Sequence, residues 1–258
     1  MAYKFLICLI TLLFPFFGYT MELCIQCHTD KLHYVSRGPC TLCHLGDGNT
    51  SRIDLAHNNI LTSNYAFFLM KDSWQVFKGN YLIKHAACMR CHIIGDAGNI
   101  LAANLNISAR EKDIKTLNEA IRNPSIYMPQ FNFSDKHITY IINTLLNHAF
   151  YRKKIEELGY LIVHFDRNVE EKNIFDENCG KCHKIILKEK GTLGEANRGP
   201  NLSGLFTDEF SSIREVKKWD EKKLKKWIRN PRDIKKNALM PPISLKENEI
   251  TDVVELFK

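Results

Sequence analysis

Cys24-Ile25-Gln26-Cys27-His28 is the first of four copies of Cys-x-x-Cys-His in this chain, and the others occupy residues 40–44, 88–92 and 179–183. Two thiols separated by two residues can bond both vinyl groups of one porphyrin, and the next residue can then ligate the iron. The pattern therefore predicts four covalently attached haem c groups, each with one iron. The predicted thioether cysteines are Cys24, Cys27, Cys40, Cys43, Cys88, Cys91, Cys179 and Cys182. The predicted axial histidines are His28, His44, His92 and His183.

Zinc or redox sites are the alternative interpretation of the cysteine pairs. Twelve residues separate Cys27 from Cys40, which is close to a zinc-ribbon spacing. That reading does not explain why a histidine follows every pair. Of the nine cysteines, eight lie in the motifs and the ninth is Cys8, so no thiol remains for a disulfide or for thiolate ligation of iron.

Residues 1–20 have the features of a secretory signal peptide. Lys4 supplies a positive charge, and an apolar run from Phe5 to Phe17 follows it. This run is short for a membrane span, so we expect export to the periplasm, where bacteria attach haem c. The alternative is an uncleaved leader that anchors the protein to the membrane.

The formal net charge of +7 gives little information about partners. Removal of Lys4 leaves +6, and eight propionates from four haems would bring the total to about −2 before iron is counted. Export excludes a nucleic-acid partner. The lysine-rich run from Arg214 to Lys236 is either a docking surface for an acidic redox protein or a solvated helix face.

Residues 21–64 form a predicted two-haem segment, which is called the head segment below. So short a stretch cannot bury two porphyrins in side chains, so the haems themselves would form its core. Two more histidines, His33 and His57, are expected to be sixth ligands; the alternative is that they are solvated. Because His33 follows His28 by only five residues, we pair His57 with the first haem and His33 with the second.

The remaining chain contains an internal duplication, which predicts domains at residues 65–152 and 153–258. Each half has a helical pattern, Cys-x-x-Cys-His, a polar loop, Leu-x-x-x-Ile-Arg-Asn-Pro, Met-Pro and a closing helical pattern. Asn-Pro falls at residues 123–124 and 230–231, and proline there predicts the end of a helix.

Each half resembles a class I cytochrome c domain in this order of motifs. The resemblance implies that Met128 and Met240 are distal iron ligands, although a buried methionine can also be core packing. It also implies that the Pro200 carbonyl accepts a hydrogen bond from His183, with Ala103 at the corresponding position of the first half. The head segment is similar to the two-haem units of small multihaem cytochromes. The whole order resembles cytochromes encoded beside selenite and tellurite reduction systems.

The expected fold is mainly α: two tandem class I cytochrome c-like helical domains preceded by a small, haem-packed, loop-rich segment. Six-coordinate haems leave no open iron, so the first functional hypothesis is an electron relay in respiration. Its partners would be redox proteins, including a possible membrane-bound donor complex, and the sequence does not indicate an oligomeric state. The alternative is a haem enzyme that reduces peroxide, nitrite or an oxyanion at an open haem of the head segment.

Overall fold

The computed structural model describes residues 22–29, 38–70, 72–125, 127–151, 173–188, 191–210 and 216–258. The predicted signal peptide, His33 and the predicted boundary at 152–153 lie outside these ranges. Contacts divide the chain into two compact units, residues 1–62 and 63–258. None of the helices in the described ranges is long and apolar enough to cross a membrane.

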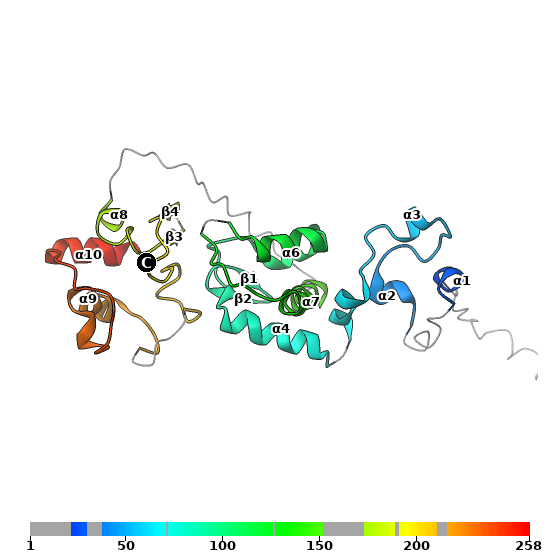
Figure 1. Cartoon of the computed structure of the whole chain (residues 1–258), viewed down its shortest axis with the longest axis horizontal. Helices are drawn as coiled ribbons and strands as arrows, with labels where there is room; N and C mark the ends of the chain where they lie inside the picture. The colour runs from blue at the N-terminus through cyan, green and yellow to red at the C-terminus, as the bar shows by residue number, and fades with distance from the viewer. Residues whose placement is uncertain are drawn as a thin grey trace, which may run out of the picture. The chain divides into compact units, whose positions relative to one another are not determined.

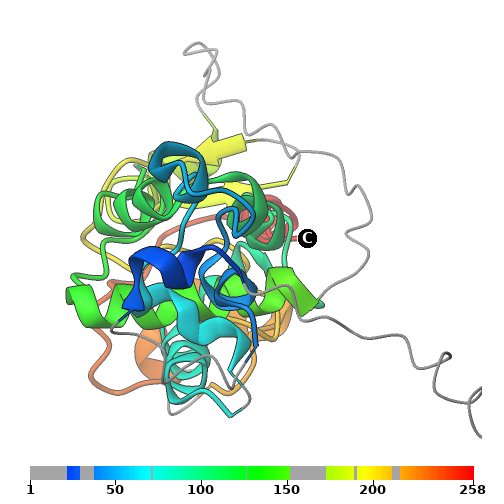
Figure 2. The same ribbon diagram turned by 90° about the vertical axis from the view of Figure 1, so that its right-hand side faces the viewer.

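The described residues of the first unit form three short α-helices, shown in blue in Figures 1 and 2. They are α1 (Cys24–Cys27), α2 (Cys40–His44) and α3 (Ile53–Ala56). Among the described residues of this unit, Leu61 is the only buried hydrophobic side chain. Five others are 40% to 68% exposed: Leu42, Leu45, Ile53, Leu55 and Ile60. The described part of this segment therefore has no side-chain core of its own.

In the second unit, residues 63–151 form what we call the middle segment. Its elements are the 3-10 helix Ser63–Leu69, α4 (Trp74–His85), the 3-10 turn Cys88–Arg90, β1 (Ile93–Ile94), β2 (Ala97–Gly98), α5 (Leu105–Glu111), α6 (Ile114–Arg122) and α7 (Asp135–Tyr151). The core lies between α4, α5, α6 and α7 and includes Ile83, Leu117, Ile138, Ile141, Ile142 and Leu145.

Helix α4 crosses α7 at Gly79 (Figure 1). A Cβ atom on Gly79 would lie 2.1 Å from Thr144 Oγ1 and 2.1 Å from the Tyr140 carbonyl oxygen. The two backbones can approach this closely only because residue 79 has no side chain. The close approach positions α4, which ends three residues before Cys88 of the third motif, against α7.

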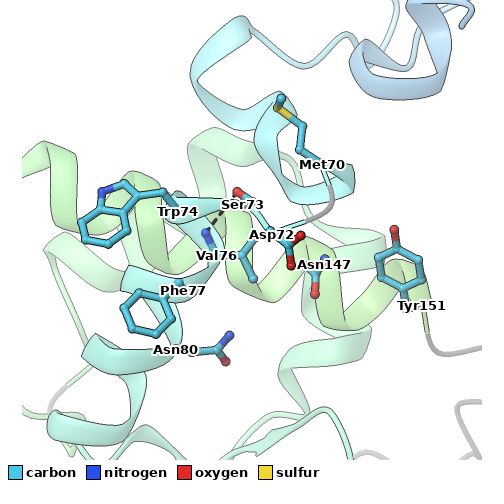
Figure 3. A pocket seen from close by; sticks show the side chains of 9 residues that line it. All are labelled: Met70, Asp72, Ser73, Trp74, Val76, Phe77, Asn80, Asn147 and Tyr151. Atoms are coloured by element: carbon cyan, nitrogen blue, oxygen red, sulfur yellow. Dashed lines mark hydrogen bonds between the residues drawn. The ribbon is translucent and has the colours of Figure 1, made fainter. Parts of the chain in front are cut away.

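Ser73 caps α4 by accepting a hydrogen bond from the Val76 amide at 3.3 Å (Figure 3). Two aromatic residues that recur at helical spacing in α4 lie outside the core: Trp74 is 57% exposed and Phe77 is 62% exposed. Together with Tyr151 of α7 they line a shallow hollow on the surface. Helical spacing alone therefore predicted the helix correctly without showing which face is buried.

Residues 173–258 form the C-terminal segment. Its elements are α8 (Ile174–Asn178), β3 (Ile185–Leu187), β4 (Gly191–Leu193), α9 (Glu221–Arg229), the 3-10 turn Pro231–Asp233 and α10 (Glu247–Glu255). Helix α9 ends at Arg229 before Asn230-Pro231, as predicted. The core of the C-terminal segment includes Leu224, Ile228, Ile250, Val253 and Val254.

A small antiparallel hairpin follows the motif histidine in both segments, β1–β2 in one and β3–β4 in the other. Each is followed by or contains a glycine at positive φ, Gly98 (+110°) and Gly194 (+74°). A Cβ there would lie 2.1 Å from the His92 carbonyl oxygen and 2.0 Å from the His183 carbonyl oxygen, respectively. The hairpins, which the sequence did not predict, pack against the backbone of the two histidines.

Candidate haem-binding sites

The motif cysteines lie at helical turns, which present both thiols of a pair together. Helices α1 and α2 contain the first two pairs, the 3-10 turn begins at Cys88, and the fourth pair directly follows α8. All eight are free thiols. Burial raises the pKa of Cys88 and of Cys179 to about 11, so these thiols are neutral at physiological pH and weakly nucleophilic without activation.

Three of the four motif histidines make the same hydrogen bond from the same ring atom. The Nδ1 atom lies 2.9 Å from the Leu61 carbonyl oxygen in His44, 2.7 Å from that of Ala103 in His92 and 2.8 Å from that of Pro200 in His183. A carbonyl oxygen only accepts, so Nδ1 carries the hydrogen. The lone pair of a neutral imidazole is then on Nε2, as ligation of a metal from that side requires.

Two of these carbonyls, those of Pro200 and Ala103, are the acceptors that the resemblance implied. The Leu61 carbonyl was not anticipated, because it lies in the head segment, outside the two halves to which that resemblance applied. Burial also lowers the pKa of His92, which favours the neutral form that can bind iron.

In the head segment the first two motifs meet at their leading cysteines. The Glu22 carboxylate accepts hydrogen bonds from the Thr41 amide, at 3.1 Å, and from the Thr41 hydroxyl. Burial and the nearby Glu22 carboxylate raise the pKa of both Cys24 and Cys40. Two porphyrins attached here would therefore lie next to each other.

His57 lies beside the first motif histidine. The ring centres of His28 and His57 are 6.0 Å apart. Two imidazoles on opposite faces of one metal would have centres about 6 Å apart, because each nitrogen bonds at about 2 Å and the ring centre lies about 1 Å beyond. The spacing fits the predicted pairing of His57 with the first haem, and ligation stays a prediction for both His57 and His33.

The two predicted methionine ligands have different surroundings. The Met240 sulfur accepts a hydrogen bond from the Trp227 indole Nε1 at 3.0 Å. A thioether sulfur has two lone pairs, so one remains for iron. Met128 lies in a turn in which its amide donates to the Ser125 carbonyl at 3.0 Å. Iron ligation by either methionine remains a prediction.

Trp219 supplies a buried donor that lacks an acceptor. Its side chain is 7% exposed, and its indole Nε1 has no hydrogen-bond partner among the described residues. A buried N–H without a partner is costly, and a haem propionate is an acceptor of suitable charge. The C-terminal segment therefore fits a haem in two respects: it contains the predicted iron ligands, and its Trp219 indole N–H is available to a propionate.

Gly199 lies flat against the ring of His183. A Cβ on Gly199 would lie 2.3 Å from His183 Cε1 and 2.5 Å from Nδ1. Gly199, the residue before the acceptor Pro200, therefore contacts the His183 ring directly and restricts its orientation. In the corresponding place of the middle segment, before Ala103, stands Ala102.

Zinc would require several of the head cysteines to converge on one point. Within the described ranges, no group of three or more His, Cys, Asp or Glu side chains is placed to hold a metal ion. The leading cysteines Cys24 and Cys40 lie near each other, and each cysteine pair is followed directly by its histidine.

Together these features are characteristic of a c-type cytochrome. They are a helical segment with paired cysteines, a histidine whose Nδ1 is held by a carbonyl, and a methionine further along the chain. Residues 170–257 match the family model described as Cytochrome c. The match supports a c-type cytochrome that binds haem c and its iron covalently and transfers electrons. No curated protein and no solved structure matches the chain.

Four residues that support the sites were not recognised from the sequence: Glu22, Leu61, Trp219 and Trp227. Trp227 had a usable signal, because it lies inside the repeated Leu-x-x-x-Ile-Arg-Asn-Pro motif where the other copy has Ala120. The other three had none, since their roles depend on through-space contacts.

Proposed function

We propose that this chain is a periplasmic tetrahaem c-type cytochrome that relays electrons in respiration, between a membrane or periplasmic donor and a terminal reductase. The family match covers only the fourth motif. The observation that extends the proposal is the repeated Nδ1–carbonyl hydrogen bond at His44, His92 and His183. Three motifs orient the histidine in the same way, so the same chemistry is proposed for all four.

The middle segment is proposed to be a second cytochrome c-like domain. It shares with the C-terminal segment the hairpin after the histidine, the glycine against the histidine carbonyl and a helix that ends before Asn-Pro. Met128 would complete its iron site as Met240 completes that of the C-terminal segment. His33 and His57 would complete the sites of the head segment.

Bound haem supplies a one-electron iron couple, and the ligating residues set its potential. Methionine at Met128 and Met240 favours the ferrous state relative to histidine, so these two sites would be reduced more readily than the sites of the head. An offset of even 0.1 V corresponds to roughly 2.3 kcal/mol for one electron. The ligands would thereby direct electrons from the head segment towards the two methionine sites.

An acidic redox partner is proposed to dock near Met240. Leu239 is 97% exposed, and the exposed lysines Lys222 and Lys226 lie on α9. Interspersed positive charge increases the rate of encounter with an acidic protein, and an exposed apolar side chain adds contact area once the complex has formed.

Two measurements on exported protein test the function. Mass spectrometry should find four haems per chain and no leader, and a redox titration should resolve a lower-potential pair and a higher-potential pair. Two haems, or bound zinc, would contradict the tetrahaem proposal. Four indistinguishable potentials, a five-coordinate high-spin fraction, or turnover of peroxide, nitrite or an oxyanion would favour the enzyme instead.

A further inference from the structure

The middle and C-terminal segments touch through the loops that flank their iron ligands. The Asn201 side-chain Nδ2 donates to the Tyr127 carbonyl at 2.9 Å, and the Tyr127 hydroxyl donates to the Gly194 carbonyl at 3.2 Å. The Lys184 ammonium lies 5.8 Å from the centre of the Tyr127 ring. Tyr127 is therefore held from three sides by the other segment.

These residues are immediate neighbours of predicted ligands on both sides. Tyr127 precedes Met128, Lys184 follows His183, and Asn201 follows Pro200, whose carbonyl accepts from His183 Nδ1 at 2.8 Å. A route therefore runs from Met128 to His183 through Tyr127, Asn201 and Pro200. Its two hydrogen bonds are Asn201 Nδ2 to the Tyr127 carbonyl and His183 Nδ1 to the Pro200 carbonyl. No bulky side chain has to be crossed along this route.

A second contact involves the third motif itself. Arg90, between Cys88 and Cys91, places its guanidinium 5.0 Å from the centre of the Phe210 ring. A Cβ on Gly204 would lie 2.8 Å from the Arg90 carbonyl oxygen. The C-terminal segment therefore covers both the cysteine turn and the methionine turn of the middle segment, which are the two parts that would hold one haem.

We propose that this contact is the internal electron-transfer junction between the two methionine sites, with Tyr127 and Asn201 as positioning residues. The proposal rests on the proposed electron-relay function. In the step, one electron leaves the site held by Met128, which is oxidised, and enters the site held by His183, which is reduced. No proton needs to move, because both hydrogen bonds of the route join neutral groups. Since the segments belong to one chain, the contact re-forms at high effective concentration each time it opens.

Asn201→Asp is the most selective variant. The Asn201 Oδ1 accepts hydrogen bonds from the Ser203 amide at 2.9 Å and hydroxyl at 2.7 Å, and an aspartate keeps both. It replaces the Nδ2 donor with an oxygen that repels the Tyr127 carbonyl. Tyr127→Phe is the second variant and removes the hydroxyl that donates to the Gly194 carbonyl. Asn118→Asp adds the same charge on α6, where Asn118 Nδ2 reaches Tyr65 inside the middle segment, and serves as the control.

The contact itself is tested by hydrogen–deuterium exchange, with the substitution in one segment and the measurement in the other. Asn201→Asp should increase exchange in a peptide covering residues 120–130, and Tyr127→Phe in a peptide covering residues 191–204. Asn118→Asp should leave residues 191–204 unchanged. Unchanged exchange across the contact in both variants would show that the segments do not dock in this way, and would overturn the proposal.

The electron step is tested on holoprotein by laser-flash reduction, following the absorbance change as the electron redistributes within the chain. Loss of one hydrogen bond at the contact should slow the internal phase roughly threefold to tenfold in Asn201→Asp, and less in Tyr127→Phe. Haem content and redox potentials measured on the same samples separate the two hypotheses. An unchanged internal rate in fully loaded variants would refute the junction and leave the relay intact, whereas missing haems in the wild type would refute the relay itself.

Discussion

The middle and C-terminal segments carry the same ligand order with different supporting residues. Both hold the motif histidine through a backbone carbonyl, from Ala103 in one and Pro200 in the other. In the C-terminal segment Trp227 donates to the Met240 sulfur, and the middle segment has Ala120, which carries no side-chain donor, at the corresponding position. Only the C-terminal segment has a glycine against the imidazole ring, at the position that Ala102 fills in the other.

The difference separates two tasks that a cytochrome sequence performs. The motifs supply the predicted ligands, which are of the same types in both segments. The neighbours of the ligands set their orientation and donor strength, and these neighbours differ. We therefore expect two methionine sites that look alike by ligand set and differ in potential and in tolerance to substitution.

The largest expected effect comes from Gly199→Ala. The new Cβ would lie within 2.3 to 2.9 Å of three ring atoms of His183, so the imidazole cannot keep its place. Mass spectrometry should find one haem fewer per chain. The reciprocal variant Ala102→Gly creates no clash in the middle segment and should retain all the haems of the wild type. Full haem content in Gly199→Ala would mean that the loop moves away without cost.

Met240→Ala tests whether the two segments share a ligand type. If both methionines bind iron, this variant should lose about half of the weak near-infrared sulfur-to-iron band and open one site to carbon monoxide. Met128→Ala should remove the other half. Met70→Ala is the control, since Met70 is 37% exposed and is not a predicted ligand. A spectrum that Met240→Ala leaves unchanged would assign Met240 to packing alone.

Gly79→Ala tests the middle segment by itself. The helix before the third motif, α4, has twelve residues, whereas the helix before the fourth motif, α8, has only five. The packing of α4 against α7 is therefore a feature of the middle segment. The clash with α7 should cost about 1–3 kcal/mol in the free energy of unfolding, outweighing the gain in helix propensity of about 1 kcal/mol. Denaturant unfolding followed by visible absorbance should show the loss in one transition. Lys84→Ala on the exposed side of α4 should change stability by less than about 0.5 kcal/mol.

The smallest expected effect is on redox potential. The Trp227 indole donates a hydrogen bond to the Met240 sulfur. If Met240 binds iron, this bond would make the sulfur a poorer donor to the ferric state and would raise the potential. Trp227→Phe should lower one methionine-site potential by about 40 mV or less, the equivalent of a hydrogen bond worth about 1 kcal/mol. Potentiometric titration measures this shift, and Trp74→Phe, which alters an exposed tryptophan of the middle segment, should not produce it. A shift of the opposite sign would reject this account of the sulfur.

Much of the architecture could be predicted from local patterns. The helices before the third motif, before each Asn-Pro and at the end of each segment lie where periodicity and proline placed them. The cysteine pairs and their histidines are also local, because the covalent spacing of five residues decides which groups can meet one porphyrin. The resemblance to class I cytochrome c implied the acceptor carbonyl of Pro200, and the repeated motif order placed Ala103 at the corresponding position.

Contacts between residues distant in sequence depended on the tertiary structure. The His44–Leu61 hydrogen bond spans the same seventeen residues as His183–Pro200, but no motif of the head segment marks Leu61 as the acceptor. Twenty-nine residues separate His28 from His57, and no motif relates them either. The hairpin glycines were missed because Gly98 follows His92 by six residues whereas Gly194 follows His183 by eleven.

The Tyr127–Asn201 hydrogen bond joins residues seventy-four positions apart. Spacing along the chain constrains groups that share a turn, and so the motifs could be read directly from the sequence. A hydrogen bond between residues of two different segments depends on how the surfaces of those segments pack, and only the three-dimensional structure contains that information.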